Sequence, residues 1–148
     1  MRKWIVAITG VGLITLFVSF YWLNVRADAE LANNKTMEIQ EGDFILHIRA
    51  ERSDGGFQVF RAIQYVGDES VEIEHQTPLI SVSLSHPNHD YTGNTVSRTL
   101  ETGNSYHPQD SIQFESPRAG TYTLFCKAEF MADDEQTNIT LQEELTFQ

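Results

Sequence analysis

An uncharged stretch of twenty residues near the N-terminus constrains this chain more than any other feature. Residues 4–23, WIVAITGVGLITLFVSFYWL, contain no Asp, Glu, Lys or Arg. As an α-helix rising about 1.5 Å per residue, the stretch is roughly 30 Å long, which matches the hydrocarbon thickness of a bilayer. A single segment can satisfy its backbone hydrogen bonds within lipid only as a helix. The sequence therefore predicts a transmembrane helix over residues 4–23, with the lipid bilayer as its partner.

The charges around this segment predict its orientation. Arg2 and Lys3 precede it, whereas a single Arg26 follows it and is itself followed by acidic residues. Basic residues close to a membrane span tend to remain on the cytoplasmic side. We therefore expect a single-pass protein of the cell membrane with a cytoplasmic N-terminus, a juxtamembrane linker and an extracytoplasmic domain, at residues 1–3, 24–36 and 37–148.

A cleaved signal peptide is the alternative to a retained anchor. Ala27-Asp28-Ala29 has the spacing of small residues that signal peptidases use, and a cut there would secrete the domain from Glu30 onward. Signal peptides usually contain about 7–15 apolar residues. The run here is longer and ends in bulky aromatic residues, which favours an anchor that is kept.

Beyond the apolar segment the chain is strongly acidic. All 21 Asp and Glu residues lie at or beyond Asp28, together with seven of the ten Lys and Arg residues, which gives that part a formal net charge of −14. Such a surface repels phosphate backbones, so nucleic acid is excluded as a partner. Cys126 is the only cysteine, and the domain must be held together without an internal disulfide.

After position 37 apolar residues recur at every second position, as in strands with one buried face. Glu143 interrupts the apolar face of the last such segment and predicts a bulge or a break around residues 142–144. Seven to eight short strands need a second layer to cover their apolar faces, so the predicted fold class is mostly β, an antiparallel β-sandwich. The predicted strands are 43–51, 57–66, 71–76, 79–85, 95–100, 110–115, 121–131 and 137–147.

Two segments resemble known sandwich domains. Residues 117–124, PRAGTYTL, resemble the corner before strand F of immunoglobulin-like and fibronectin-III-like domains, and residues 64–73, QYVGDESVEI, are similar to a strand-turn-strand unit of bacterial sandwiches. The resemblance implies an immunoglobulin-like sandwich in which Tyr122 folds its hydroxyl back onto the preceding turn. It also implies that Cys126 lies in strand F. The chain departs from the antibody type because Cys126 has no partner cysteine and the domain contains no Trp.

Histidines and tyrosines of the predicted loops are the candidate binding residues. His86 and His89 are spaced to bind one metal ion, and Asp90, or His107 in a second loop, could complete the site. Loop histidines usually bind nothing, so no metal and no cofactor is predicted. Tyr91 and Tyr106 are the candidate contacts for a protein partner, on one edge formed by the two loops, because Tyr is favoured at interfaces.

No catalytic arrangement emerges from the sequence. A copper site of the cupredoxin kind needs a histidine after the cysteine, and none follows Cys126. Strand alternation places Cys126 in the core, away from any substrate. The function we expect is a non-catalytic interaction or accessory module on the outer face of the membrane. The alternative is a metal- or ligand-binding sensor that uses the loop histidines, and an enzyme has the least support.

Overall fold

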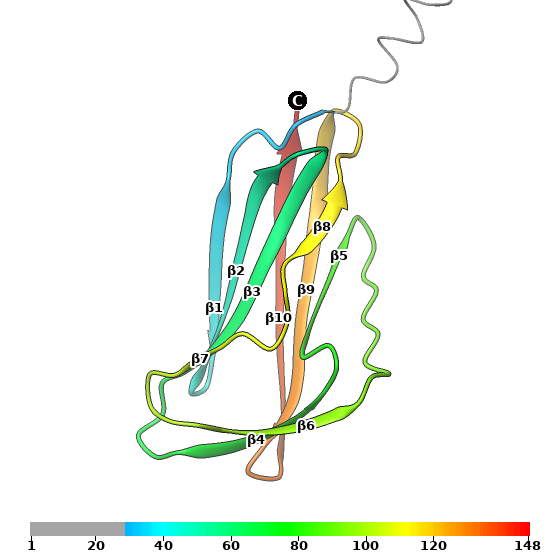
Figure 1. Ribbon diagram of the computed structural model, residues 1–148. Helices are drawn as coiled ribbons and strands as arrows, with labels where there is room; N and C mark the ends of the chain where they lie inside the picture. The colour runs from blue at the N-terminus through cyan, green and yellow to red at the C-terminus, as the bar shows by residue number, and fades with distance from the viewer. Residues whose placement is uncertain (1–28) are drawn as a thin grey trace, which may run out of the picture.

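The computed structural model describes residues 29–148, which form two antiparallel β-sheets that face one another (Figure 1). The mostly β, antiparallel fold expected from the sequence is confirmed. The transmembrane helix expected at residues 4–23 lies outside the described residues. Within residues 29–148, no helix has the length and apolar character needed to cross a membrane.

Each sheet contains five strands. In sheet I the strand order is β1–β2–β3, and both β7 and β8 pair with the other edge of β3. The strands of sheet I are β1 (Lys35–Glu41), β2 (Phe44–Ser53), β3 (Gly56–Tyr65), β7 (Ser105–Tyr106) and β8 (Ile112–Glu115). In sheet II the strand order is β10–β9–β4–β6, and β5 also pairs with β9. The strands of sheet II are β4 (Val71–Gln76), β5 (Ile80–Leu84), β6 (Thr95–Leu100), β9 (Gly120–Ala132) and β10 (Glu135–Phe147).

Residues 29–148 form ten strands where seven to eight were expected, and the additional ones are β1 and β7. β1 is an edge strand that buries only Met37, so its sequence lacks the regular apolar alternation of a core strand. β7 contains two residues, too few to give any periodic signal.

The core lies between the inward-facing rows of the two sheets. Period-two alternation produces these rows, because successive side chains of a strand point to opposite faces. Aromatic rings join the layers: Phe57 of β3 stacks on Phe114 and packs against Phe147 of β10, with ring centroids 5.0 and 5.2 Å apart. Phe44 of β2 meets Phe130 of β9 edge-on at 4.8 Å.

Arg61 belongs to the inward-facing row of β3 that also contains Phe57, and it is only 9% exposed. Its guanidinium donates to the backbone oxygen of Ile80 at 2.9 Å and to that of Asp110 at 3.2 Å. The Arg61 Nε atom is buried without a hydrogen-bond partner in the described part of the chain. This side chain therefore ties β3 of sheet I to the first residue of β5 in sheet II.

Residues 29–36, which belong to the linker expected at residues 24–36, pack onto the sandwich. Ala29 and Leu31 are 6% and 1% exposed. Glu30 and Gln148 exchange two backbone hydrogen bonds of 3.0 Å, which adds a short strand-like segment to the end of β10. The ordered domain thus includes residues that precede position 37.

Glu143 causes no bulge or break, so that expectation is wrong. β10 pairs with β9 in one unbroken register from Glu135 to Phe147, with Glu143 opposite Leu124. The Glu143 carboxylate contacts the Lys35 ammonium of β1, which supplies a positive charge where the apolar row is interrupted. The strand is kept because its polar side chain has a partner from the other sheet.

The corner expected at Tyr122 is formed only in part. Gly120 has φ +153°, and the Tyr122 ring lies beside it. The ring packs edge-on against Phe147, with centroids 5.8 Å apart. Among the hydrogen bonds of residues 29–148, none joins the Tyr122 hydroxyl to the preceding turn.

Leu31→Ala should lower the free energy of unfolding by about 2–4 kcal/mol, because it leaves a cavity where residues 29–36 meet the core. Urea unfolding of the full-length protein in detergent micelles, followed by circular dichroism, measures this loss. Ile39→Ala on β1 is the matched control, since Ile39 is 38% exposed, and it should change stability by less than about 0.5 kcal/mol. Equal stability of the Leu31 variant and the parent would contradict the inclusion of this segment in the fold.

Candidate functional site

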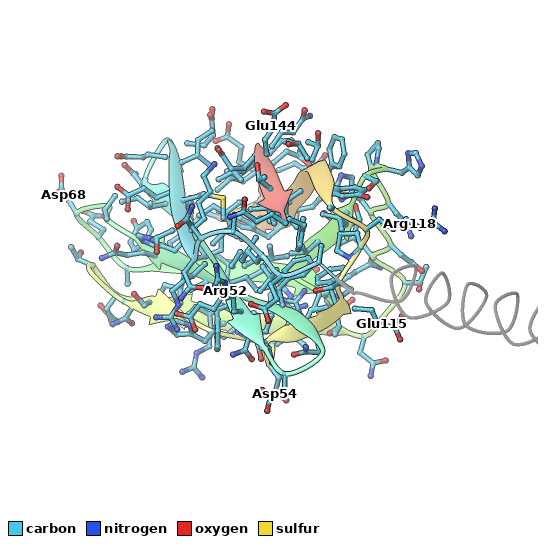
Figure 2. All side chains as sticks on the ribbon, turned by 90° about the horizontal axis from the view of Figure 1, so that it is seen from above. Arg52, Asp54, Asp68, Glu115, Arg118 and Glu144 are labelled. Atoms are coloured by element: carbon cyan, nitrogen blue, oxygen red, sulfur yellow. The ribbon has the colours of Figure 1, made fainter. Side chains whose placement is uncertain are left out.

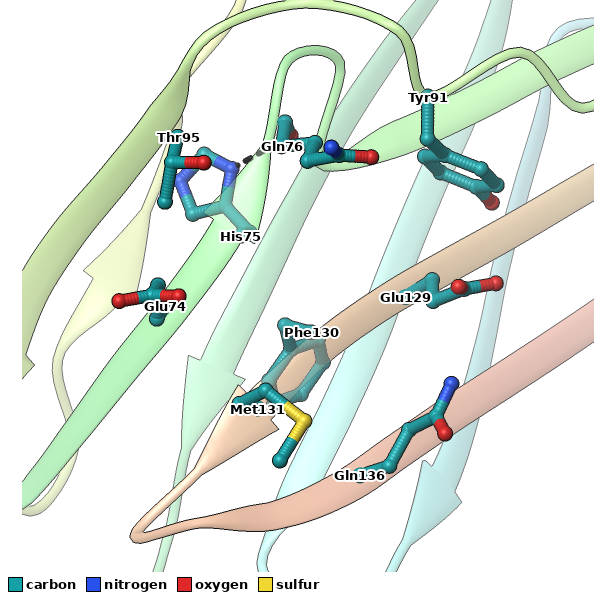
Figure 3. Close-up of a pocket in the computed structure, with 9 residues that line it drawn as sticks. All are labelled: Glu74, His75, Gln76, Tyr91, Thr95, Glu129, Phe130, Met131 and Gln136. Carbon is teal, nitrogen blue, oxygen red and sulfur yellow. Dashed lines mark hydrogen bonds between the residues drawn. The ribbon is translucent and has the colours of Figure 1, made fainter.

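A hollow of about 250 Å³ opens on the outer face of sheet II (Figure 3). It lies where β9 changes its neighbour, from β5 beside residues 124–128 to β4 beside residues 131–132. Side chains of β4, β6, β9, β10 and one loop surround it, and the lining residues are Glu74, His75, Gln76, Tyr91, Thr95, Glu129, Phe130, Met131 and Gln136. The hollow combines carboxylates and amides with an aromatic ring and an exposed thioether.

The loop of residues 85–94 forms one wall of this hollow. It leaves the end of β5 and runs back alongside that strand before β6 begins (Figure 1). Gly93 donates its N–H to the Thr77 oxygen at 2.9 Å. A Cβ atom at Gly93 would lie 2.3 Å from that oxygen, so the close approach of the two backbones requires glycine.

Ser81 of β5 holds the loop against the sheet. It is 5% exposed, and its hydroxyl is hydrogen-bonded to His89 Nδ1. The Tyr91 hydroxyl lies 3.3 Å from Ser81 Oγ and donates to the Lys127 backbone oxygen at 2.8 Å. Two loop side chains therefore meet at one buried hydroxyl, and this anchors the wall of the hollow.

A charged pair lies beside this anchor. Lys127 Nζ is 2.7 Å from Glu129 Oε2 and 5.7 Å from the centre of the Tyr91 ring. The hydrogen bond to Glu129 raises the pKa of Lys127, and burial raises the pKa of Tyr91. The ammonium therefore stays charged and the phenol stays a hydrogen-bond donor at neutral pH.

The three candidate histidines do not converge. His86 is exposed and shares the loop with His89, whose Nδ1 is engaged by Ser81. His107 lines a depression on the outer face of sheet I, next to His47 and Phe60. Residues 29–148 contain no group of three or more His, Cys, Asp or Glu side chains arranged to hold a metal ion.

The two candidate tyrosines lie on different sides of sheet II. Tyr91 faces the hollow on the outer side, whereas Tyr106 packs against the core between the sheets. The Tyr106 hydroxyl is 3.1 Å from Nε2 of His75, which is 4% exposed and also bonds the Gln76 oxygen. Tyr91 is thus the candidate partner contact that lines a surface feature.

Cys126 lies where strand alternation predicts it, fully buried in the inward row of β9. Burial raises the pKa of its thiol to about 12, against the opposing effect of the Arg61 charge. The thiolate form that attacks substrates is therefore negligible at neutral pH.

Sequence reasoning missed the side chains that complete the hollow. Met131 and Gln136 occupy outward positions beside the hairpin that joins β9 to β10, and Gln76 lies on an outward position of β4. Alternation marks such positions as solvent-facing, but nothing local marks them as part of one concave surface. Only the pairing of β9 with both β4 and β10 brings them together.

Acidification should release the loop, because burial and then the Lys127 charge lower the pKa of His89 below 6.5. The His89 imidazole binds a proton more readily when the loop is released. The closed loop therefore has its full stability above about pH 6.5 and becomes less stable as the pH falls through the lowered pKa of His89. Hydrogen exchange of the full-length protein at about pH 7 and pH 5, corrected for intrinsic rates, should show faster exchange over residues 85–94 at the lower pH. His89→Gln should lack this response, and an identical pH dependence in both proteins would refute the assignment.

Comparison with known proteins identifies no family and no relative for this chain. The chain matches no protein-family model and no curated protein.

Proposed function

We propose that this chain is a membrane-anchored, non-catalytic interaction module on the outer face of the membrane. Residues 4–23 would hold it in the bilayer, and residues 29–148 would present an immunoglobulin-like sandwich to a protein partner. The observation that carries the proposal is the hollow on sheet II, whose wall is a loop fixed by partly buried hydrogen bonds.

A fixed loop favours recognition because little conformational entropy is lost when a partner binds. Tyr91 and Met131 belong to the residue types enriched at protein interfaces, and Met131 is 36% exposed. Glu74 and Gln76 provide polar contacts around them. This combination of an apolar contact with a polar surround is typical of a protein-binding surface.

The arrangement of the chain ends supports display from a membrane. Ala29 and the C-terminus lie at the same end of the sandwich as the turn between β2 and β3 (Figure 1). Figure 2 views this end, where Arg52 and Arg118 lie among Asp54, Glu115 and Glu144. An anchor preceding Ala29 would place this mixed-charge end toward the bilayer and the opposite end away from it.

The buried position of Ala29 favours a retained anchor over cleavage and secretion. A cut after Ala29 would remove a residue that is 6% exposed in the fold.

The resemblance of residues 117–124 to an immunoglobulin-like corner supports an immunoglobulin-like sandwich. β9 starts at Gly120, directly after the turn, and the Cys126 side chain of this strand points into the core.

Photocrosslinking in intact source cells tests the proposed function. A benzophenone amino acid in place of Gln76, in the hollow, should give a discrete adduct with a partner protein. Gln113 of β8 is the matched control, because it is equally solvent-facing and lies on sheet I. The same adducts from both positions, or none from Gln76, would contradict the assignment of the hollow as the contact surface.

A further inference from the structure

A groove of about 610 Å³ is lined by residues of the β1–β2 turn and of the β9–β10 hairpin. These two turns lie at the end of the sandwich opposite Ala29 (Figure 1). The side chains of Phe44, Tyr65 and Val71 contribute apolar surface to the floor of the groove. Phe44 and Tyr65 come from sheet I, with ring centroids 5.2 Å apart, and Val71 comes from sheet II. The floor therefore continues the hydrophobic core to the surface.

Carboxylates form the rim of this groove. Asp43 lies in the turn between β1 and β2, and Asp133 and Glu135 belong to the hairpin between β9 and β10. Asp133 has φ +45° and accepts a hydrogen bond from the Glu72 N–H through Oδ1 at 3.2 Å, which fixes its position. Among residues 29–148, the twelve that line the groove include no Lys or Arg, so no described basic side chain neutralises this negative charge within the groove.

Tyr65 offers an unused polar group between these carboxylates. Its side chain is 6% exposed, and no hydrogen bond joins its hydroxyl to any other residue in the range 29–148. The ring lies against Gly67, where a Cβ atom would come within 2.2 Å of the hydroxyl oxygen. Burial, followed by the charges of Asp43, Asp133, Asp68 and Glu69, raises the pKa of Tyr65, which keeps the phenol neutral and its oxygen free to accept.

We propose that this groove binds a Lys- or Arg-rich segment of the partner protein. An alkyl stem would lie on Phe44 and Val71, and its charged head would lie between Asp43 and Asp133 and donate to the Tyr65 hydroxyl. Long basic side chains suit such a site because they pair an apolar stem with a charged tip. The proposal rests on the proposed function, since it presumes that the domain meets a protein partner.

The chemistry of the groove selects this occupant over other ligands. Uncompensated carboxylates repel phosphate groups and acidic peptides. A divalent cation would need several carboxylates on one point, and the described residues contain no group of three or more so arranged. The apolar floor is also of no use to a bare ion, whereas it suits a peptide side chain.

Fluorescence anisotropy of the full-length protein in micelles, with a fluorescein-labelled octalysine peptide, tests the proposal. Asp43→Asn with Asp133→Asn should weaken binding at least about tenfold, and Tyr65→Phe about threefold. Asp54→Asn with Glu115→Gln removes the same charge at the opposite end (Figure 2) and should change binding less than about twofold. Glu135→Gln, at an exposed hairpin position, provides a second rim variant should the double substitution impair folding.

Three results would overturn the proposal. Equal losses in the two double variants would show general attraction to an acidic domain, and an unchanged affinity of Tyr65→Phe would remove the hydroxyl from the site. Displacement of the peptide by equimolar Ca²⁺ at constant ionic strength would identify a cation site instead. Failure of the peptide experiment leaves crosslinking from Gln76 unaffected, because Gln76 does not line the groove.

Discussion

The buried Arg61 guanidinium connects the two sheets at the start of β5, the strand that anchors the loop beside the hollow on sheet II. Its hydrogen bond to the Ile80 oxygen fixes the start of β5, and the Gln109 side chain accepts from the Ile80 N–H at 3.2 Å. Ser81 follows directly and anchors the loop through His89 and Tyr91. An arginine is well suited to this role because its planar group donates in several directions at once. The hollow on sheet II therefore depends on a contact made on the other side of that sheet.

The distribution of charge gives the domain two unlike ends. The basic residues of the described part are largely engaged: four form ion pairs, and Arg61 is buried. Exposed ion pairs of this kind stabilise a fold by little, about 0–1 kcal/mol each. Their larger consequence is electrostatic, because no basic side chain within residues 29–148 pairs with the carboxylates around Tyr65. These carboxylates create a negative potential at the end opposite Ala29.

Much of the fold could be predicted from the sequence because it depends on local alternation. The inward positions of Arg61 and Cys126 and the turn before Phe57 follow from period-two patterning and glycine chemistry. Glu143 shows the limit of this reasoning. Its local pattern suggests a break, but a lysine 108 residues away pairs with it and the strand continues.

The candidate site could be predicted much less well, because loop positions depend on which sheet each strand joins. His89 and His107 look like possible neighbours in the sequence, yet β5 belongs to sheet II and β7 to sheet I. The loop after β5 therefore covers one outer face, and His107 lies on the other. Alternation predicts which face of its own strand a side chain occupies, but it does not predict which sheet that strand joins.

Hydrogen exchange of Arg61→Met in the full-length protein is the most direct test of the link between Arg61 and the site. Met retains the apolar stem but cannot donate to Ile80, so residues 79–94 should exchange faster while β10 keeps the exchange rates of the parent protein. Unchanged exchange over residues 79–94, or a uniform acceleration across both sheets, would contradict the dependence of the hollow on this buried guanidinium.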